Sequence, residues 1–327
     1  MPCVENRLML TRRDLLAKAA AAAVGCNARL ACATASQPAT PVNFTVPSGA
    51  CDCHTHIIGD AAKFPFAMKR AYTPETASPE EMSALHRALH IQRVVIVTPS
   101  VYGTDNAATL YGMKARGPNA RGIAVIDERT PVSDLDAMDR AGMRGVRLNL
   151  ATARQNDPIV ARRLFQSSLD RVRNLKWHIQ IFTNLSVITG IKDLIEASPV
   201  PVVFDHFGGA QASLGTTQPG WVDLVDLIRS GKAYVKLSAA YRISARPPDY
   251  PDVPRLAKAL VAANPDRILW GSDWPHPNST PSRSVTEITP LLAIDDGSLL
   301  NQLAGWVPDA TIRARILVDN PVRLYGF

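Results

Sequence analysis

Two histidines separated by one residue lie in the stretch where residues able to do chemistry are most concentrated. His54 and His56 belong to the run Ala-Cys-Asp-Cys-His-Thr-His-Ile-Ile-Gly, residues 50–59, whose apolar start predicts a β-strand. Alternate residues of a strand point to the same face, so both rings are expected to face one space. Such a pair can bind a divalent metal ion or polarise a water molecule, and the competing interpretation is a chance pair on a solvated face.

Asp273 follows another apolar run, in the sequence Gly-Ser-Asp-Trp-Pro-His of residues 271–276. A carboxylate at the end of a buried strand needs a partner, and capping the following turn is the structural alternative to a catalytic role. Because His54, His56 and His206 are expected nearby, we expect Asp273 to be a site carboxylate that acts as a general base toward water.

His206 follows Asp205 and precedes the pair Gly208 and Gly209, which allows the backbone to approach closely. A buried structural histidine is an equally good interpretation of this residue taken alone. His276 lies beyond the last strand and is expected to have a supporting role.

Three arginines are candidates for binding an anion. Arg147 lies within an apolar strand pattern, where a guanidinium needs either a bound anion or a neighbouring carboxylate. Arg154 and Arg242 lie in predicted loops and could instead be solvated. Acting together, the three could hold a dianionic substrate.

The elements that must position these residues follow one repeated pattern. Short apolar runs alternate with helical patterns, which is typical of a (β/α)₈ barrel, whose active site lies at the carboxyl ends of its strands. An open doubly wound sheet is the competitor, but no Gly-x-Gly-x-x-Gly follows the first run. The predicted strands are residues 50–57, 93–98, 121–126, 145–149, 177–182, 201–205, 233–237 and 268–271, and the predicted helices are residues 79–89, 134–141, 159–172, 187–197, 221–230 and 253–263. Residues 274–305 are expected to form a long loop over the site.

The first 35 residues are set apart by their composition. Thr-Arg-Arg-Asp-Leu-Leu at residues 11–16, an Ala-rich apolar stretch and a small-residue cleavage site at 33–35 predict a twin-arginine export signal, and hence a periplasmic protein. An ordinary basic helix, and a cytoplasmic protein, is the alternative. Residues 36–49 are predicted to be an arm, and residues 50–327 the catalytic domain.

Net charge and cysteine content limit the classes of function and partner that the protein can have. The formal net charge is +7, and it falls to +4 without the leader, which holds five basic and two acidic residues. No basic run suggests nucleic acid, no apolar run beyond the leader is long enough to span a membrane, and a mild positive excess suits a small anionic substrate. Outside the leader only Cys51 and Cys53 remain, and apolar packing is their expected role.

The ordered set of motifs resembles the amidohydrolase superfamily over roughly residues 48–327. Within it, the chain is similar to the branch of 2-pyrone-4,6-dicarboxylate hydrolases and 4-sulfomuconolactone hydrolases. The matching segments are His54-Thr55-His56, Pro99-Ser100 with residues 102–106, Gly145-Val146-Arg147, Asp205-His206 and residues 271–276.

This resemblance implies a (β/α)₈ barrel that hydrolyses an anionic lactone. It places His54, His56, His206 and Asp273 at the catalytic positions, where they would also be the ligands of a metal ion. It assigns Tyr72, Ser100, Arg147, Arg154 and Arg242 to the substrate. Phe182 stands where relatives have a Tyr or a metal-ligating His, which implies a changed partner for the anionic group and favours a sulfonated lactone. Without a histidine there, a binuclear site is not expected, and the choice is between one zinc ion and none.

Three alternatives to a lactone hydrolase remain open from the sequence. A lactone isomerase on the same scaffold would remove a carbon-bound proton instead of activating water. A metal-dependent decarboxylase would need a fuller ligand set. An exported binding protein would have no use for a buried base beside imidazoles. Neither the exact lactone nor the oligomeric state follows from the sequence.

Overall fold

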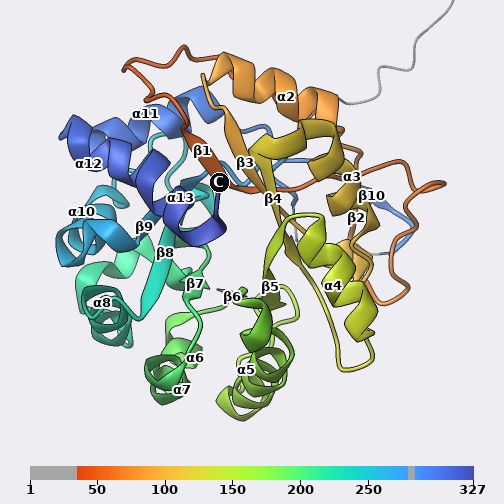
Figure 1. The fold of residues 1–327 in the computed structure, drawn as a ribbon. Coiled ribbons are helices and arrows are strands. Elements are labelled where there is room, and N and C mark those ends of the chain that lie inside the picture. The colour runs from red at the N-terminus through yellow and green to blue at the C-terminus, as the bar shows by residue number, and fades with distance from the viewer. Residues whose placement is uncertain (1–34, 279–283) are drawn as a thin grey trace, which may run out of the picture. The chain divides into compact units, whose positions relative to one another are not determined.

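The structure, a computed structural model, describes residues 35–278 and 284–327 of the 327-residue chain. In this described part, eight parallel strands run in the order β1-β3-β4-β5-β6-β7-β8-β9 and form the inner wall of a barrel (Figure 1). The strands are β1 (Cys51–Thr55), β3 (Arg93–Val97), β4 (Ala120–Ala124), β5 (Met143–Asn149), β6 (His178–Phe182), β7 (Val202–Phe204), β8 (Ala233–Ser238) and β9 (Ile268–Gly271). Each overlaps a predicted apolar run, so the predicted (β/α)₈ barrel is confirmed.

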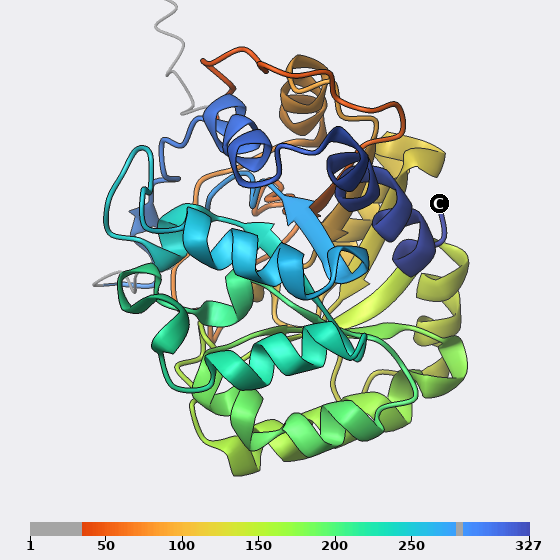
Figure 2. The same ribbon diagram turned by 90° about the vertical axis from the view of Figure 1, so that its left-hand side faces the viewer.

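Helices cover the outside of the strands, and α8 and α10 lie side by side there (Figure 2). The helices are α2 (Pro79–Ala88), α3 (Ala107–Arg116), α4 (Val132–Arg140), α5 (Pro158–Val172), α6 (Leu185–Gly190), α7 (Lys192–Ala197), α8 (Trp221–Arg229), α9 (Ala240–Ile243), α10 (Pro254–Ala263), α11 (Asp296–Trp306), α12 (Ala310–Ala314) and α13 (Asn320–Tyr325). The start of α2 is a capping box, in which the Ser78 side chain accepts from the Glu81 amide and the Glu81 carboxylate accepts from the Ser78 amide.

Three features of the helices differ from the sequence prediction. The helix predicted at 187–197 is two helices, α6 and α7, and α3 was not predicted. Gly112 in the middle of α3 weakens the helical pattern, but an added Cβ there would lie 2.5 Å from Ile57, so close packing requires the glycine. The stretch 274–305 is not simply a loop, because it contains a short strand, β10 (Ile288–Thr289), which pairs with β2 (Thr73–Pro74), and most of α11.

The seam between the first and last strands is closed by a buried carboxylate. Asp52 on β1 accepts hydrogen bonds from the Ser272 amide (3.0 Å), the Ser272 hydroxyl (2.5 Å) and the His54 amide (3.0 Å). Beyond it, the Asp273 amide donates to the His54 carbonyl (2.9 Å) and the His56 amide donates to the Trp274 carbonyl (2.8 Å). These bonds fix the two histidines of β1 beside Asp273.

The segment before β1 packs along the outside of the barrel. The indole of Trp274 donates to the Ser36 carbonyl (3.0 Å), and the Asp295 carboxylate before α11 accepts from the Thr40 amide and hydroxyl. Cys51 and Cys53 are buried, free of disulfides and packed in the apolar interior with Val95 and Tyr325, which confirms their predicted apolar role.

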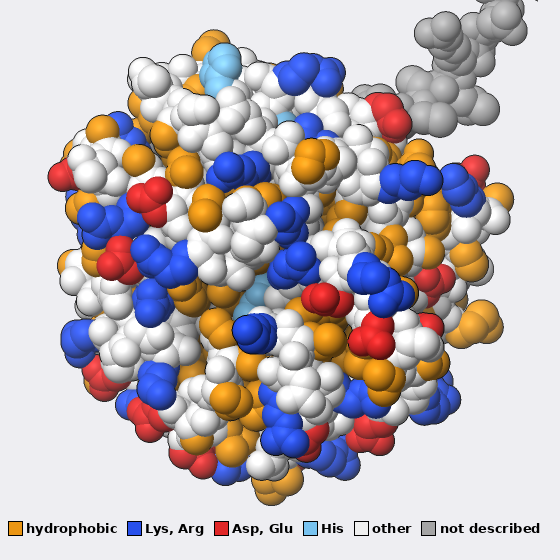
Figure 3. Space-filling view, in the orientation of Figure 1, with side chains coloured by type: hydrophobic (Ala, Val, Ile, Leu, Met, Phe, Trp, Pro, Cys, Tyr) orange, Lys and Arg blue, Asp and Glu red, His pale blue; other side chains and the backbone are white. Residues whose placement is uncertain are grey.

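The predicted export signal, residues 1–35, lies almost wholly outside the described residues, which begin at residue 35. Within the described ranges, no helix is both long and apolar enough to cross a membrane. On the face of the molecule seen in Figure 3, Lys and Arg side chains are interspersed with acidic and hydrophobic ones.

Candidate active site

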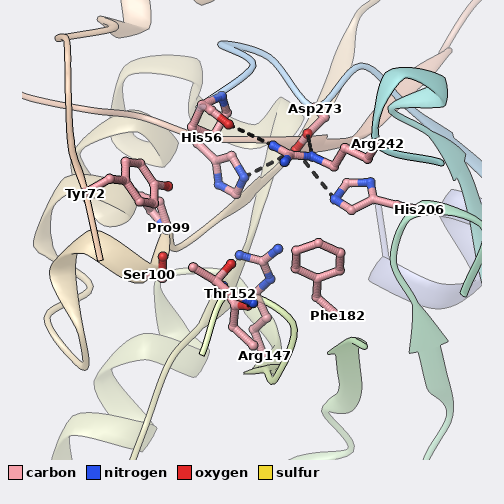
Figure 4. A pocket seen from close by; sticks show the side chains of 12 residues that line it. His56, Tyr72, Pro99, Ser100, Arg147, Thr152, Phe182, His206, Arg242 and Asp273 are labelled. Carbon is pink, nitrogen blue, oxygen red and sulfur yellow. Dashed lines mark hydrogen bonds and ion pairs between the residues drawn. The ribbon is translucent and has the colours of Figure 1, made fainter. Parts of the chain in front are cut away.

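A small cavity lies at the carboxyl ends of the barrel strands (Figure 4). This is the end at which barrel enzymes carry their catalytic groups. Its wall includes most of the residues selected from the sequence, and they lie at the ends of the barrel strands or in the segments that follow them. These residues are His56, Tyr72, Ser100, Arg147, Phe182, His206, Arg242 and Asp273.

The two oxygens of Asp273 have different surroundings. Oδ2 accepts hydrogen bonds from the Tyr241 hydroxyl (2.6 Å) and from Nε of Arg242 (2.6 Å). Oδ1 is buried, has no hydrogen-bond partner among the described residues, and lies 3.5 Å from Nε2 of His54, 3.5 Å from Nε2 of His56 and 3.7 Å from Nε2 of His206. One oxygen is therefore anchored, and the other faces three imidazoles.

The backbone around these residues takes unusual conformations. Asp273 has φ +68° and His206 has φ +47°, a region that residues with a side chain rarely adopt. After His206 the chain turns through Gly209, where a Cβ would lie 2.0 Å from the Thr183 carbonyl oxygen. Only glycine fits there, and the turn directs the His206 ring toward Asp273. Strained backbone of this kind is concentrated at functional sites.

Burial and neighbouring charges set the protonation of the site. Burial lowers the pKa of His54 and His56, and it lowers the pKa of His206 to about 4, so the three imidazoles are neutral at pH 7. Burial alone would raise the pKa of Asp273, but Arg242 and then His206 outweigh it and hold that pKa well below its usual range. Asp273 is therefore an ionised carboxylate among neutral rings.

A second polar layer lies below the cavity, inside the barrel. Nζ of Lys236 donates to Oε1 of Gln180 (2.7 Å) and contacts Nδ1 of His54 (3.2 Å) and Oδ1 of Asp205 (3.2 Å). The other carboxylate oxygen, Asp205 Oδ2, accepts from Nε2 of Gln180 (3.0 Å) and Nε of Arg147 (3.3 Å). All of these side chains are almost fully buried.

Four residues of the site were not predicted from the sequence to have a role in it: Lys236, Gln180, Asp205 and Tyr241. A signal for Lys236 was present, because a lysine within an apolar strand is as costly to bury as an arginine and needs a partner. It also lies two residues before Ser238, whose hydroxyl bonds Nδ1 of His206 (2.8 Å), and so shares its face of β8. Tyr241 follows a strand end and carried no comparable signal.

The arginines do not act as one group. Arg147 is a mostly buried part of the cavity wall, and its Nε donates to Asp205 Oδ2. Arg242 is committed to Asp273 and, through Nη2, to the Pro277 carbonyl (3.0 Å). Arg154 lies in an exposed turn with φ +52° and is not among the residues that line the cavity, so the structure does not bring it to the site. A clamp of three arginines around one substrate is not what the structure shows.

Phe182 lies at the inner end of β6, between two site residues. Its ring is 4.9 Å from the His206 ring and 5.6 Å from the Arg147 guanidinium. It thus occupies a wall of the cavity with an apolar surface. His276 lies outside the cavity, where Nδ1 contacts the Tyr241 hydroxyl (3.2 Å) and Nε2 bonds Asp296 (2.9 Å), in line with its expected supporting role.

The donor atoms around Asp273 Oδ1 fit a single zinc ion. Imidazole nitrogen and carboxylate oxygen bind zinc at roughly 2.0–2.2 Å, so ligand atoms in a tetrahedron lie roughly 3.3–3.6 Å apart. Nε2 of His54 and Nε2 of His56 each lie 3.5 Å from Asp273 Oδ1, which agrees with this spacing, and the ligand atoms of the three residues all lie within 4.8 Å of one another. His54 Nε2 and Asp273 Oδ1 are buried without a hydrogen-bond partner among the described residues.

A second group of possible ligands, His54, Asp205 and His206, does not fit a metal ion equally well. The Lys236 ammonium lies 3.2 Å from both His54 Nδ1 and Asp205 Oδ1, where a second cation would be repelled. The charge of Lys236 therefore disfavours a second metal ion at this position.

Comparison with known proteins shows the family to which the chain belongs. The family model described as "Amidohydrolase" matches residues 51–327. The chain is 36% identical over 286 residues to a 4-sulfomuconolactone hydrolase of Rhizobium radiobacter, covering 88% of this chain and 93% of the relative. It is 33% identical over 299 residues to a 2-pyrone-4,6-dicarboxylate hydrolase of Comamonas testosteroni, covering 89% and 94%.

A solved structure has the same architecture. It is that of a Pseudomonas putida protein assigned as a 2-pyrone-4,6-dicarboxylic acid hydrolase, which is 29% identical with a TM-score of 0.72. The alignment covers 86% of this chain and 98% of the solved one.

Proposed function

The chain belongs to the amidohydrolase family, and from this premise we propose that it is a lactonase that opens an anionic lactone ring by adding water to its carbonyl group. One observation carries the proposal. Three imidazole nitrogens surround a free oxygen of an ionised carboxylate, in a cavity whose wall also contains a buried arginine. The relatives named above act on 4-sulfomuconolactone and 2-pyrone-4,6-dicarboxylate, and lactones of this kind are the proposed substrates.

Arg147 would bind the anionic group of the substrate. Its Nε is occupied by Asp205, while the two Nη groups can donate to a carboxylate or sulfonate in the bidentate manner typical of arginine. Tyr72 and Ser100 lie on the side of the cavity away from Phe182 and His206 (Figure 4) and can donate to further substrate oxygens. Binding at these positions would hold the ring carbonyl near Asp273.

Asp273 would be the general base. Its Oδ1 accepts a proton from a water molecule as the water oxygen forms a bond to the lactone carbonyl carbon. Arg242 and Tyr241 hold Oδ2 and so keep Oδ1 directed at the cavity. The carbonyl oxygen becomes an oxyanion, which His206 can stabilise through an Nε2–H group.

Ring opening would follow from the tetrahedral adduct. The bond between the carbonyl carbon and the ring oxygen breaks, and the ring oxygen takes the proton held by Asp273. The new carboxyl group keeps the water oxygen and loses its remaining proton to solvent. A zinc ion, when bound, would be held by His54, His56 and Asp273 and would supply a Lewis acid for the carbonyl and a more acidic water.

The test is ring opening of 4-sulfomuconolactone and 2-pyrone-4,6-dicarboxylate by purified protein, with and without added zinc, followed by loss of ultraviolet absorbance. We expect turnover of at least one substrate. We expect Asp273→Asn to lose roughly 10³-fold in kcat, the scale of a general base, while substrate binding measured by calorimetry persists. Asp170→Asn, which changes an exposed aspartate, should leave both unchanged.

Oxygen isotope incorporation separates the hydrolase from a lactone isomerase. In ¹⁸O-labelled water, hydrolysis places one labelled oxygen in the new carboxylate, whereas isomerisation places none. Folded protein that turns over neither lactone, with or without zinc, would contradict the proposal. Asp273→Asn that keeps full activity would remove the proposed base.

We also propose that the protein is exported to the periplasm. The support is the twin-arginine pattern of residues 11–16 and the small residues at 33–35. Cell fractionation checks the proposal, since an exported protein should be recovered in the periplasmic fraction and shortened at its N-terminus.

A further inference from the structure

The buried lysine below the cavity makes contact with only one of the three site histidines. Nζ of Lys236 lies 3.2 Å from Nδ1 of His54, inside the barrel and away from the residues that line the cavity. An ammonium group has three N–H donors and no acceptor. Gln180 Oε1 and His54 Nδ1 lie within hydrogen-bond distance of Nζ, and the ionised carboxylate of Asp205 forms an ion pair with it at 3.2 Å.

The lysine contact determines which nitrogen of His54 carries the proton. Because Lys236 can only donate, Nδ1 of His54 must accept, and the single proton of the neutral ring is then on Nε2. Asp205 Oδ1 is the competing partner, at 3.1 Å from the same nitrogen. Although Asp205 Oδ1 is close, it accepts no hydrogen bond among the described residues. An N–H on His54 Nδ1 therefore does not have the right direction to donate to this oxygen.

His56 has the opposite arrangement. Its Nδ1 lies 2.7 Å from the Val97 carbonyl oxygen, which can only accept. The proton of neutral His56 is therefore on Nδ1, and Nε2 presents a lone pair to the cavity. Two histidines separated by one residue thus present a donor and an acceptor to the same oxygen, Asp273 Oδ1, each at 3.5 Å.

We propose that Lys236 is a positioning residue that keeps the proton of neutral His54 on Nε2, where it faces the space beside Asp273. A water molecule in that space accepts from His54 Nε2–H and donates to His56 Nε2 and Asp273 Oδ1. All of its hydrogen bonds then direct a lone pair of its oxygen away from the base, toward the lactone carbonyl. The inference deepens the proposed function, because it gives the nucleophilic water its orientation.

The same arrangement has a consequence for zinc. A histidine that binds zinc through Nε2 carries its proton on Nδ1 and usually donates it to a carboxylate or a carbonyl. His56 already meets this condition. His54 meets it only if its proton moves to Nδ1, so that Nδ1–H donates to Asp205 and no longer accepts from Lys236. Lys236 therefore opposes zinc at a donor set that otherwise fits it, and Asp205 favours zinc.

The first test is the protonation of His54 in the wild-type protein. Two-dimensional ¹H–¹⁵N correlation of the histidine rings at pH 7 distinguishes a protonated from an unprotonated ring nitrogen. The His54 signals are assigned by their loss in His54→Gln, and the His56 signals by their loss in His56→Gln. We expect a proton on Nε2 of His54 and on Nδ1 of His56. A proton on Nδ1 of His54 would overturn the proposal without any variant of Lys236.

The second test removes the donor. In Lys236→Met, Asp205 becomes the remaining partner of His54 Nδ1, so the proton should move to Nδ1 and the affinity for zinc should rise at least about tenfold. Zinc affinity is measured by competition with a chromophoric chelator. The lactonase kcat should fall about 10- to 100-fold with little change in KM, because Lys236 does not line the cavity.

Two further variants separate positioning from packing. Lys236→Arg keeps a cationic donor and should keep the His54 proton on Nε2. Lys236→Met/Asp205→Asn removes both charges together, so no lone carboxylate is left buried, and it should lose most of the gain in zinc affinity.

The results of these experiments either support or contradict the positioning role of Lys236. Folded Lys236→Met with the wild-type zinc affinity and an unchanged His54 spectrum would contradict the proposal. If Lys236→Met fails to fold, the wild-type spectrum and the double variant still decide it. The spectra and the zinc titration need no lactone, so they can fail or succeed independently of the lactonase assay.

Discussion

At the scale of single residues, the anchoring of Asp273 Oδ2 is as important as the freedom of Oδ1. Tyr241 and Arg242 each donate to Oδ2 at 2.6 Å, and Tyr241 is in turn contacted by His276, which bonds Asp296. A carboxylate with one fixed oxygen cannot rotate its other oxygen away from the water. The donors also keep the carboxylate ionised, which a base requires.

Tyr241→Phe removes one of these donors and leaves the residues that line the cavity unchanged, because Tyr241 is not one of them. A hydrogen bond to a charged group contributes about 1.5–3 kcal/mol, so we expect kcat to fall roughly 10- to 100-fold with KM nearly unchanged. Steady-state kinetics on the preferred lactone measures both. Tyr111→Phe, at a partly buried tyrosine outside the site, is the matched control. An equal rise in KM would show that Tyr241 binds substrate instead.

Arg147 and Arg154 provide a paired test of the anion site. Arg147 lines the cavity, whereas Arg154 lies in an exposed turn outside it. We expect Arg147→Gln to raise KM by roughly 10- to 100-fold, since it loses charge-assisted bonds to the anionic group. Arg154→Gln should leave KM unchanged. A rise in KM for Arg154→Gln would restore the role that the resemblance assigns to it.

At the scale of elements, β5 and β6 show how packing below the site determines its position. Gly145 lies two residues before Arg147 on β5, and it pairs in register with His178 of β6. A Cβ at Gly145 would lie 2.6–2.8 Å from three atoms of the His178 ring, so the glycine leaves room for that ring. The ring lies in turn against Tyr325 of α13 (centroids 5.3 Å apart).

Gly145→Ala should therefore displace β5 or the His178 ring. Overpacking a dense core costs about 1–3 kcal/mol, and we expect that loss in the free energy of unfolding measured with urea. The displacement should also raise KM, because β5 carries Arg147. Gly305→Ala, in α11, is the control, since nothing lies within 4 Å of its added Cβ and alanine favours a helix. Equal stability of the two variants would contradict the close packing at Gly145.

At the scale of the whole molecule, buried histidines make stability depend on pH. Burial lowers the pKa of His206 to about 4 and that of His178 to about 3. In the unfolded chain both rings bind a proton near pH 6.5, so below that pH the unfolded state holds more protons than the folded one. Stability is therefore complete above about pH 6.5 and falls as the pH is lowered toward 4.

Urea unfolding at several pH values between 7.5 and 4.5 measures this loss. His178→Phe keeps a ring of similar size and removes the titrating group, so its stability should fall less steeply over the same range. His90→Asn changes an exposed histidine and should leave the slope as in the wild type. A slope unaffected by His178→Phe would show that other groups carry the pH dependence.

Local sequence patterns were sufficient to predict the barrel and the strand ends that carry the site residues. Apolar runs and helical patterns are local properties, and each of the eight runs became a strand of the barrel. The carboxyl ends of parallel strands meet at one end of a barrel, so His54, His56, His206 and Asp273 could be grouped without knowing any distance. The helix at residues 107–116 was not predicted because Gly112 interrupts its weak helical pattern. The close contact with Ile57, which only the structure shows, explains why a glycine is needed there.

The contacts between polar side chains inside the barrel could not be predicted without the three-dimensional structure. The strand period shows that Lys236 and Ser238 share a face, but the tilt and register of eight strands determine that Lys236 reaches His54 and that Arg147 lies beside Gln180. The same is true of the arginines, because loop geometry leaves Arg154 exposed and commits Arg242 to Asp273. These contacts join residues far apart in the chain, and no local pattern encodes the distance between them.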